Sequence, residues 1–269
     1  MQNIKLKSGD EIPILGLGTW QMTGRTCTEA VKNALELGYR HIDTADIYKN
    51  HLDIAPALKE SDLDRSELFI TSKVFRENLH YEDVLKSERF LKELGIEYLD
   101  LLLIHWPNKN VPIKETLKGL AELKEKGIAK NIGVSNFTID LIKEAMEYYP
   151  ELITVNQVEF HPFLYQKELL NFCREKNIVL TAYSPLARGK IFQNDVIVEL
   201  AEKINKSPAQ LVLKWLIDKE IVVIPKASSI EHIRDNMDLF DWEIPAEIVG
   251  KIDNINTVER LIDPPFSQF

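Results

Sequence analysis

Eight short apolar runs alternate with longer amphipathic segments along the chain, and this alternation limits the fold more than any other feature. The runs are apolar nearly throughout, as in strands that are buried on both faces of a sheet. We predict strands at Ile14–Leu17, His41–Thr44, Leu68–Lys73, Leu99–His105, Ala129–Val134, Thr154–Val158, Val179–Tyr183 and Val222–Pro225. The intervening helices are predicted at Thr28–Leu37, Leu52–Glu60, Tyr81–Leu94, Ile113–Lys126, Thr138–Tyr148, Gln166–Lys176, Asp195–Ile204, Ser207–Lys219 and Ile230–Phe240.

Strict alternation of strand and helix with short connections implies a parallel sheet. Eight such units within 269 residues favour a closed (β/α)8 barrel, with an open doubly wound sheet as the alternative. Gly38, Gly95 and Gly127 each follow a predicted helix, where glycine adopts the left-handed cap conformation without steric cost. Thr138 and Ser207, which precedes a proline, are predicted helix starts.

Two predicted features lie outside the eight units. Asn3–Leu6 and Ile12, joined by the turn Ser8–Asp10, read as a β-hairpin that plugs the N-terminal end of the barrel. An extra C-terminal helix is predicted near Pro245–Ile255. The chain contains no linker-like or low-complexity stretch, so we expect residues 1–269 to form a single α/β domain, a TIM barrel with these two additions.

Composition excludes several classes of partner and suggests a location. The net charge of −9 disfavours binding to nucleic acid or to anionic membranes. The longest apolar stretch, Leu99 to Trp106, is interrupted by Asp100 and falls short of the roughly 20 residues that span a bilayer. The N-terminus lacks the apolar core of a signal peptide, and Cys27 and Cys173 are too few for a disulfide framework, so we expect a cytoplasmic monomer. Neither the six histidines nor the cysteines show metal-ligand spacing, so no metal is expected.

Polar residues end three consecutive predicted strands. Asp43, Lys73 and His105 stand at these ends, and Tyr48 follows Asp43 in its loop. Each has an ordinary structural interpretation alone: a turn cap, a solvated lysine, a core imidazole and a surface aromatic. The C-terminal ends of barrel strands meet at one mouth, so together they predict an acid, a cation, an imidazole and a phenol in one place.

This set of groups suits the reduction of a carbonyl. A phenol has a pKa near 10, too high for easy proton donation at neutral pH unless a nearby cation stabilises the phenolate, and Lys73 is placed to be that cation. Asp43 would keep a buried Lys73 charged. His105 could donate a hydrogen bond that orients the carbonyl, while the hydride comes from elsewhere.

These residues lie in motifs that resemble those of the aldo-keto reductases. The resemblance spans nearly the whole chain in the family's order and rests on Gly38–Ala45 with Tyr48, Thr71–Val74, Leu103–Pro107, Gly133–Phe137, Val155–Pro162, Ala182–Leu186 and Ile224–Lys226. It implies that Asp43, Tyr48, Lys73 and His105 are catalytic. In that case Tyr48 acts as general acid in reduction and as general base in alcohol oxidation.

The resemblance also implies a nicotinamide cofactor bound extended across the mouth. Gly16-Leu17-Gly18 lacks the third glycine of a Rossmann fingerprint, which such a barrel does not need. By resemblance, Ser135, Asn136 and Gln157 hold the carboxamide and Tyr183 stacks on the ring. The remaining cofactor-binding positions, on the pyrophosphate and adenosine side, are Ser184, Leu186, Lys226 and Asn236.

One departure from the family pattern concerns the choice of cofactor. Members that prefer NADP often have Ser or Thr after the lysine and an Arg five residues further on, whereas this chain has Ala227 and His232. Lys226, His232 and Ser228 or Ser229 can still contact a 2′-phosphate, and the start of the following helix favours an anion. We therefore expect NADP(H), with NAD(H) as the alternative.

The substrate side is predicted to be apolar. Trp20, Phe75 and Trp106 follow three strand ends and are expected to form the wall of the substrate pocket, with packing at the barrel rim as the alternative. The chain ends soon after its last predicted helix, where larger members have a longer segment, so an open and tolerant pocket is expected. Asn50 is followed by His51 where the family usually has Glu, which affects the expected loop packing rather than the chemistry.

The sequence thus predicts an NADP(H)-dependent oxidoreductase that reduces small aldehydes or ketones to alcohols, with Tyr48 as the proton donor. Two alternatives remain. One is a nicotinamide-binding regulatory barrel that resembles a channel subunit and has little turnover. The other is a barrel aldolase that uses Lys73 as a Schiff-base amine.

Overall fold

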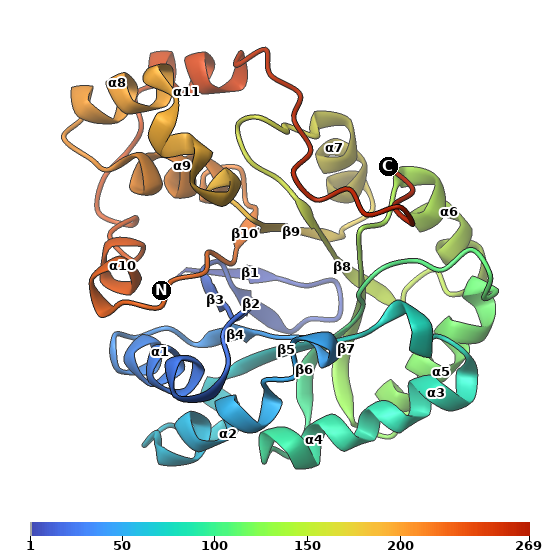
Figure 1. The fold of residues 1–269 in the computed structure, drawn as a ribbon. Coiled ribbons are helices and arrows are strands. Elements are labelled where there is room, and N and C mark those ends of the chain that lie inside the picture. The colour runs from blue at the N-terminus through green and yellow to red at the C-terminus, as the bar shows by residue number, and fades with distance from the viewer. Residues whose placement is uncertain (1) are drawn as a thin grey trace.

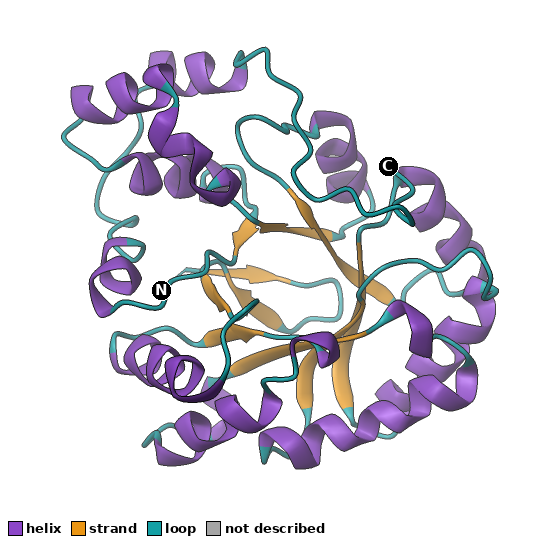
Figure 2. Cartoon of the chain, viewed as in Figure 1, coloured by secondary structure: helices purple, strands orange, loops and turns teal. Residues whose placement is uncertain are grey.

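A computed structural model describes residues 2–269 and shows a barrel of parallel strands surrounded by helices (Figures 1 and 2). Eight strands are hydrogen-bonded in chain order from β3 to β10. The first and last strands also meet, because Leu15 and Val223 form a parallel bridge and the N–H of Val223 donates to the carbonyl of Ile14 at 2.8 Å. The strands are β3 Gly16–Gly18, β4 His41–Asp43, β5 Phe69–Val74, β6 Leu99–Ile104, β7 Ala129–Ser135, β8 Ile153–Glu159, β9 Val179–Tyr183 and β10 Val222–Val223. The predicted (β/α)8 barrel is confirmed.

The helices lie outside the barrel and bury their apolar faces against it (Figure 2). They are α1 Gly24–Glu36, α2 His51–Glu60, α3 Tyr81–Leu85, α4 Arg89–Leu94, α5 Ile113–Glu125, α6 Ile139–Tyr148, α7 Lys167–Glu175, α8 Asp195–Lys203, α9 Pro208–Ile217, α10 Ile230–Asp235 and α11 Ala246–Asp253. Within residues 2–269, none of them has the length and apolar character needed to cross a lipid bilayer.

Three helix predictions were wrong in detail. The helix predicted to begin at Thr28 begins four residues earlier, at Gly24. The segment predicted as one helix over Tyr81–Leu94 is divided by a 3-10 turn at Lys86–Glu88. The backbone stays right-handed through the turn, with φ −60° and ψ −31° at Leu85, so the helical path tightens rather than stops. The helix predicted to reach Phe240 ends at Asp235, and turns follow it.

The predicted helix ends are confirmed at residues that were chosen for their local chemistry. Gly38, Gly95 and Gly127 have φ of +102°, +69° and +73°, the left-handed region that glycine tolerates. The side chains of Thr138 and Ser207 each accept the backbone N–H three residues further on, which satisfies one of the free donors of the helix.

The N-terminal hairpin closes the end of the barrel opposite the mouth, as predicted. Strand β1 (Asn3–Lys5) pairs antiparallel with β2 (Glu11–Pro13). Its apolar side chains form a small buried cluster with the interior residues of the strands: Leu6, Ile12, Phe69, Leu101, Leu103, Val155 and Val222. A ligand can therefore reach the barrel interior only from the C-terminal ends of the strands, where the polar residues gather.

Candidate active site

The four predicted catalytic residues come together at the mouth of the barrel. Asp43 ends β4, Tyr48 lies in the 3-10 turn Asp46–Tyr48 that follows, Lys73 lies in β5, and His105 follows β6. Asp43, Tyr48 and His105 line a cavity of about 310 Å³. Lys73 is completely buried and is held against Asp43 behind the cavity wall.

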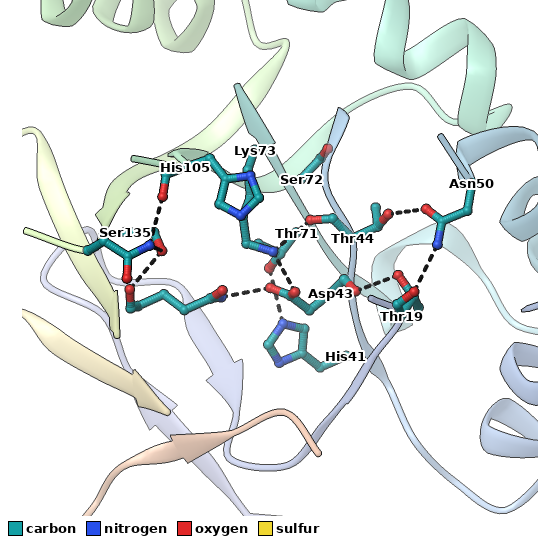
Figure 3. A network of polar contacts seen from close by, with 12 residues as sticks. Thr19, His41, Asp43, Thr44, Asn50, Thr71, Ser72, Lys73, His105 and Ser135 are labelled. Carbon is teal, nitrogen blue, oxygen red and sulfur yellow. Dashed lines mark hydrogen bonds and ion pairs between the residues drawn. The ribbon is translucent and has the colours of Figure 1, made fainter. Parts of the chain in front are cut away.

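Asp43 and Lys73 form a buried ion pair (Figure 3). The Lys73 Nζ lies 2.5 Å from Asp43 Oδ1 and donates a second hydrogen bond, of 2.8 Å, to the Thr44 carbonyl. The other carboxylate oxygen accepts a 2.7 Å hydrogen bond from Gln157 Nε2. Burial lowers the pKa of Lys73, and the adjacent Asp43 carboxylate opposes this shift. The pair is therefore held rigidly and screened from water.

The Tyr48 ring lies between this pair and His105. Its centroid is 5.2 Å from Lys73 Nζ and 5.6 Å from the centroid of the His105 ring, which it meets edge-on. Burial raises the pKa of Tyr48 well above its ordinary value, and the Asp43 carboxylate adds to this. This direction is opposite to the effect expected of Lys73, because burial, the larger cause, and the Asp43 carboxylate both raise the pKa. At neutral pH Tyr48 therefore carries its proton.

His105 is a neutral imidazole at neutral pH. Burial, with a contribution from the Lys73 charge, lowers its pKa well below the ordinary value. Its Nδ1 is buried and has no hydrogen-bond partner among the described residues. A neutral ring carries a single N–H, so His105 can donate one hydrogen bond to a carbonyl without bringing a charge into the cavity.

The residues expected around a carboxamide form a hydrogen-bonded corner of the mouth. Ser135 Oγ donates to the Gln157 carbonyl at 2.7 Å, and Asn136 Nδ2 donates to the His105 carbonyl at 3.0 Å. The Tyr183 hydroxyl donates to Asn136 Oδ1 at 2.7 Å. Asn136, Gln157 and Tyr183 line the catalytic cavity, whereas Ser135 is completely buried and lies behind them.

A second cavity, of about 470 Å³, adjoins the first. Both cavities are lined by Trp20, Ser184, Arg188 and Lys226, so together they form an elongated site. The second cavity is also lined by the other predicted cofactor residues Leu186, His232 and Asn236.

Ser228 and Ser229 were the serines predicted to contact the 2′-phosphate, and neither lines the second cavity. Ser228 is exposed and lines neither of the two cavities. Ser229 caps α10 instead, because its hydroxyl accepts the backbone N–H of His232 at 3.3 Å. Of the residues predicted to contact the 2′-phosphate, Lys226 and His232 line the second cavity.

Arg188 lines both cavities, and the sequence reasoning missed it. Its guanidinium lies 4.7 Å from the centroid of the Trp20 ring. The backbone is left-handed at Ala187, Arg188 and Gly189, which turns the loop after Ser184 back over the mouth. Only glycine commonly marks such a turn in a sequence, and two of these three residues are not glycine.

The apolar wall is larger than expected. Trp20, Phe75 and Trp106 all line the catalytic cavity, together with four apolar residues that were not predicted for this wall, Ile47, Ile224, Ile262 and Phe266. The Phe266 ring meets Trp106 edge-on at 5.5 Å. The C-terminal segment therefore reaches the mouth and forms part of its wall.

His51 stands where the family usually has Glu, and its ring contacts the carboxylate of Glu93 in α4. Its Nδ1 lies 2.7 Å from Glu93 Oε2 and its Nε2 lies 2.9 Å from Ser72 Oγ. Glu93 also binds Arg89, whose guanidinium reaches Asp46 in the turn that carries Tyr48. Glu93 in α4 thus links His51 to the turn that carries Tyr48 through Arg89.

Comparison with known proteins identifies the family. The sequence profile of the Aldo/keto reductase family matches residues 14–257, which include every predicted catalytic and cofactor position. The chain belongs to the aldo/keto reductase family. It is 45% identical over 260 residues to "Glyoxal reductase" of Bacillus subtilis, with 96% of this chain and 94% of that protein covered. This membership makes the protein an oxidoreductase that acts on aldehydes or ketones.

Solved structures of aldo-keto reductases share the fold. The aldo-keto reductase MGS-M4 from a Medee basin deep-sea metagenome library superposes with a TM-score of 0.94 at 38% identity, covering 100% of this chain and 99% of that one. An aldo-keto reductase complexed with NADPH gives 0.93 at 32% identity, covering 99% and 91%. Among residues 2–269 of the present aldo/keto reductase, no group of three or more His, Cys, Asp or Glu side chains is arranged to hold a metal ion.

Proposed function

We propose that this protein reduces small aldehydes, with dicarbonyls of the glyoxal type as the first class to test, to alcohols with NADP(H). The observation that carries the proposal is the buried Asp43–Lys73 pair beside a protonated Tyr48 and a neutral His105. The names of a glyoxal reductase relative and of a structural neighbour complexed with NADPH support the substrate class and the cofactor.

The residues present fit a dinucleotide. The two adjoining cavities offer an amide-lined end beside the catalytic groups and an end where the basic side chains of Arg188 and Lys226 lie, with His232 and Asp235 also lining the second cavity. When bound, the nicotinamide supplies a hydride to the carbonyl carbon. The carboxamide would be held by Ser135, Asn136 and Gln157, the ring would lie against Tyr183, and the phosphates would meet Ser184, Leu186, Arg188, Lys226, His232 and Asn236.

The catalytic side chains then have separate tasks. The N–H of His105 donates to the carbonyl oxygen and orients the carbonyl in the cavity. Tyr48 gives its hydroxyl proton to that oxygen as negative charge develops there. The resulting phenolate faces the ammonium of Lys73, 5.2 Å from the ring centroid, and is reprotonated from solvent. Asp43 holds the ammonium in place and keeps it charged in a site that burial would otherwise neutralise.

The preference for NADPH over NADH depends on the groups that can bind the 2′-phosphate, and this chain has fewer of them than the family pattern. Ala227 is buried and has no hydroxyl to donate, and His232 stands where the family often has Arg. Lys226 remains as a permanent positive charge beside the second cavity. We propose that NADPH is preferred and that NADH is also used.

The geometry disfavours the aldolase alternative. A Schiff base needs a lysine amine that a substrate carbonyl can reach. The Lys73 side chain is 0% exposed, and its ammonium is occupied by Asp43 and by the Thr44 carbonyl. We therefore propose an electrostatic role for Lys73 rather than a nucleophilic one.

One assay plate tests the proposal. The purified protein is mixed with NADPH or NADH and with glyoxal, simple aliphatic and aromatic aldehydes, ketones and sugars, and loss of reduced-cofactor absorbance is followed. We expect turnover with glyoxal and NADPH, and slower turnover with NADH. The proposal is wrong if neither cofactor is oxidised with any carbonyl, or if borohydride traps a substrate on Lys73.

A further inference from the structure

The C-terminal segment, residues 259–269, reaches the substrate cavity without forming a helix or strand. Figure 1 shows it in red, leading from α11 toward the side of the barrel where α6 and α7 lie. Two of its side chains, Ile262 and Phe266, line the catalytic cavity. A segment without its own regular structure needs specific contacts to hold those side chains in place.

One buried carboxylate makes those contacts. Glu159 ends β8, and its side chain is 0% exposed. Its Oε1 accepts the backbone N–H of Leu261 at 2.8 Å, and its Oε2 accepts that of Ile262 at 3.0 Å. His161 Nε2 lies 2.9 Å from Oε1, so both oxygens of the carboxylate are satisfied.

This arrangement fixes the segment more firmly than surface contacts could. Burial alone would raise the pKa of Glu159, but the hydrogen bonds from His161 and from the two backbone N–H groups bring it below the ordinary value. Glu159 is therefore an anion at neutral pH, buried where water cannot replace its donors. An anion in that setting is costly to leave unpaired, so the segment and the carboxylate hold each other.

The contacts on either side extend the anchor toward the substrate. The N–H of Glu259 donates to the Phe163 carbonyl at 2.7 Å, just before the anchored residues. Beyond them, the Phe266 ring meets Trp106 edge-on at 5.5 Å and lies under the Arg76 guanidinium at 4.2 Å. The anchor thus determines where Phe266 meets the substrate cavity.

We propose that Glu159 is a positioning residue that holds residues 261–269 against the mouth and thereby sets the preference for aldehydes large enough to touch Ile262 and Phe266. The substrate part of this inference rests on the proposed carbonyl reduction, whereas the anchoring part does not. Glyoxal has no apolar group that these side chains could bury, whereas an aromatic aldehyde gains apolar contact with them.

The variant Glu159→Gln tests the anchor with little change in shape. An amide has one acceptor oxygen and an NH2 group, so one of the two backbone N–H groups must face another donor. The Arg260–Leu261 peptide bond should then open to trypsin, and mass spectrometry should detect release of residues 261–269. Asp263→Asn is the matched control, because it neutralises an exposed carboxylate on the same segment, and it should stay as resistant as the unmodified protein.

The same variants test the preference for larger aldehydes. The ratio of kcat/KM for benzaldehyde to kcat/KM for glyoxal should fall about tenfold in Glu159→Gln, as expected when part of an aromatic contact is lost. The ratio cancels any shared effect on cofactor binding. A chain that ends at Arg260 should show the same fall, and it decides the question if Glu159→Gln does not fold.

Two results would overturn the inference: a segment as resistant to trypsin in Glu159→Gln as in the unmodified protein, or an unchanged ratio in the shortened chain. Should the unmodified protein oxidise NADPH with neither aldehyde, the proposed function fails instead. In that case the trypsin result by itself tests whether Glu159 holds residues 261–269 in place.

Discussion

Replacing Asp43 by Asn should destabilise the protein strongly, because it leaves the Lys73 ammonium buried without its counter-charge. Lys73 is completely buried, and its Nζ lies 2.5 Å from the carboxylate that would be lost. Removing one partner of such a pair costs about 3–5 kcal/mol. The asparagine oxygen also cannot accept from both Lys73 and Gln157 in the way that the two carboxylate oxygens do.

The stability deficit of Asp43→Asn should depend on pH, and the direction of the Lys73 pKa shift gives the sign of that dependence. Without Asp43, only burial acts on Lys73, so its folded-state pKa falls further below the unfolded-state value of about 10.4. Between those two pKa values the unfolded chain binds more protons than the folded one, and stability therefore rises with pH. The deficit of Asp43→Asn relative to the unmodified protein should be full below the lowered folded-state pKa of Lys73 and should shrink as the pH rises from there toward the unfolded-state value.

Urea denaturation at several pH values measures this deficit. The double variant Asp43→Asn/Lys73→Met is the matched control, because it removes the buried charge together with its partner. It should recover part of the lost stability and show no comparable pH dependence. A deficit below about 1 kcal/mol, the size expected of an exposed pair, or a deficit that does not change with pH, would refute the reasoning.

Three further predictions test other parts of the site and the barrel. Because burial keeps His105 neutral, kcat/KM should show no titration of this ring between about pH 6 and 8; a step there that disappears in His105→Gln would contradict this. In Lys226→Met, the factor by which KM for NADPH rises should be about ten times the factor for NADH, as expected for one lost charged hydrogen bond. Equal factors would exclude a contact between Lys226 and the 2′-phosphate. Gly133→Ala should lower the free energy of unfolding, measured in urea, by about 1–3 kcal/mol, because a Cβ there would lie 2.6 Å from the Val155 carbonyl oxygen. Gly250→Ala is the control, because a Cβ there would have no atom within 4 Å, and it should not lower the free energy of unfolding. Equal losses in the two variants would refute the packing argument.

The architecture could be predicted from the sequence because its signals are local and repeated. Each strand is a short apolar run, and glycine caps such as Gly38 and Gly95 stand where a helix must stop. The positions of Asp43 and His105 at strand ends then place them at one mouth, since all parallel strands of a barrel end on the same side. Family motifs supplied the remaining positions.

The parts that sequence reasoning missed depend on long-range packing. Phe266 lies in an irregular segment with no hydrophobic period, and the backbone of that segment is bonded at Leu261 and Ile262 to Glu159, more than a hundred residues earlier in the chain. Arg188 lies within a left-handed turn in which both Ala187 and Arg188 have positive φ, and Gly189 alone does not reveal that turn in the sequence. The direction of the Tyr48 pKa shift depends on how completely the ring is buried and on the charge balance around Lys73, neither of which can be read from residue types.

The most direct test of the central claim is the variant Tyr48→Phe, which removes only the hydroxyl proposed to donate the proton. We measure NADPH oxidation with glyoxal, and NADPH binding by fluorescence titration. The account predicts a fall in kcat of about 10²–10⁴-fold, the usual contribution of a general acid, with NADPH affinity retained. Turnover close to that of the unmodified protein would contradict the assignment of Tyr48 as the proton donor.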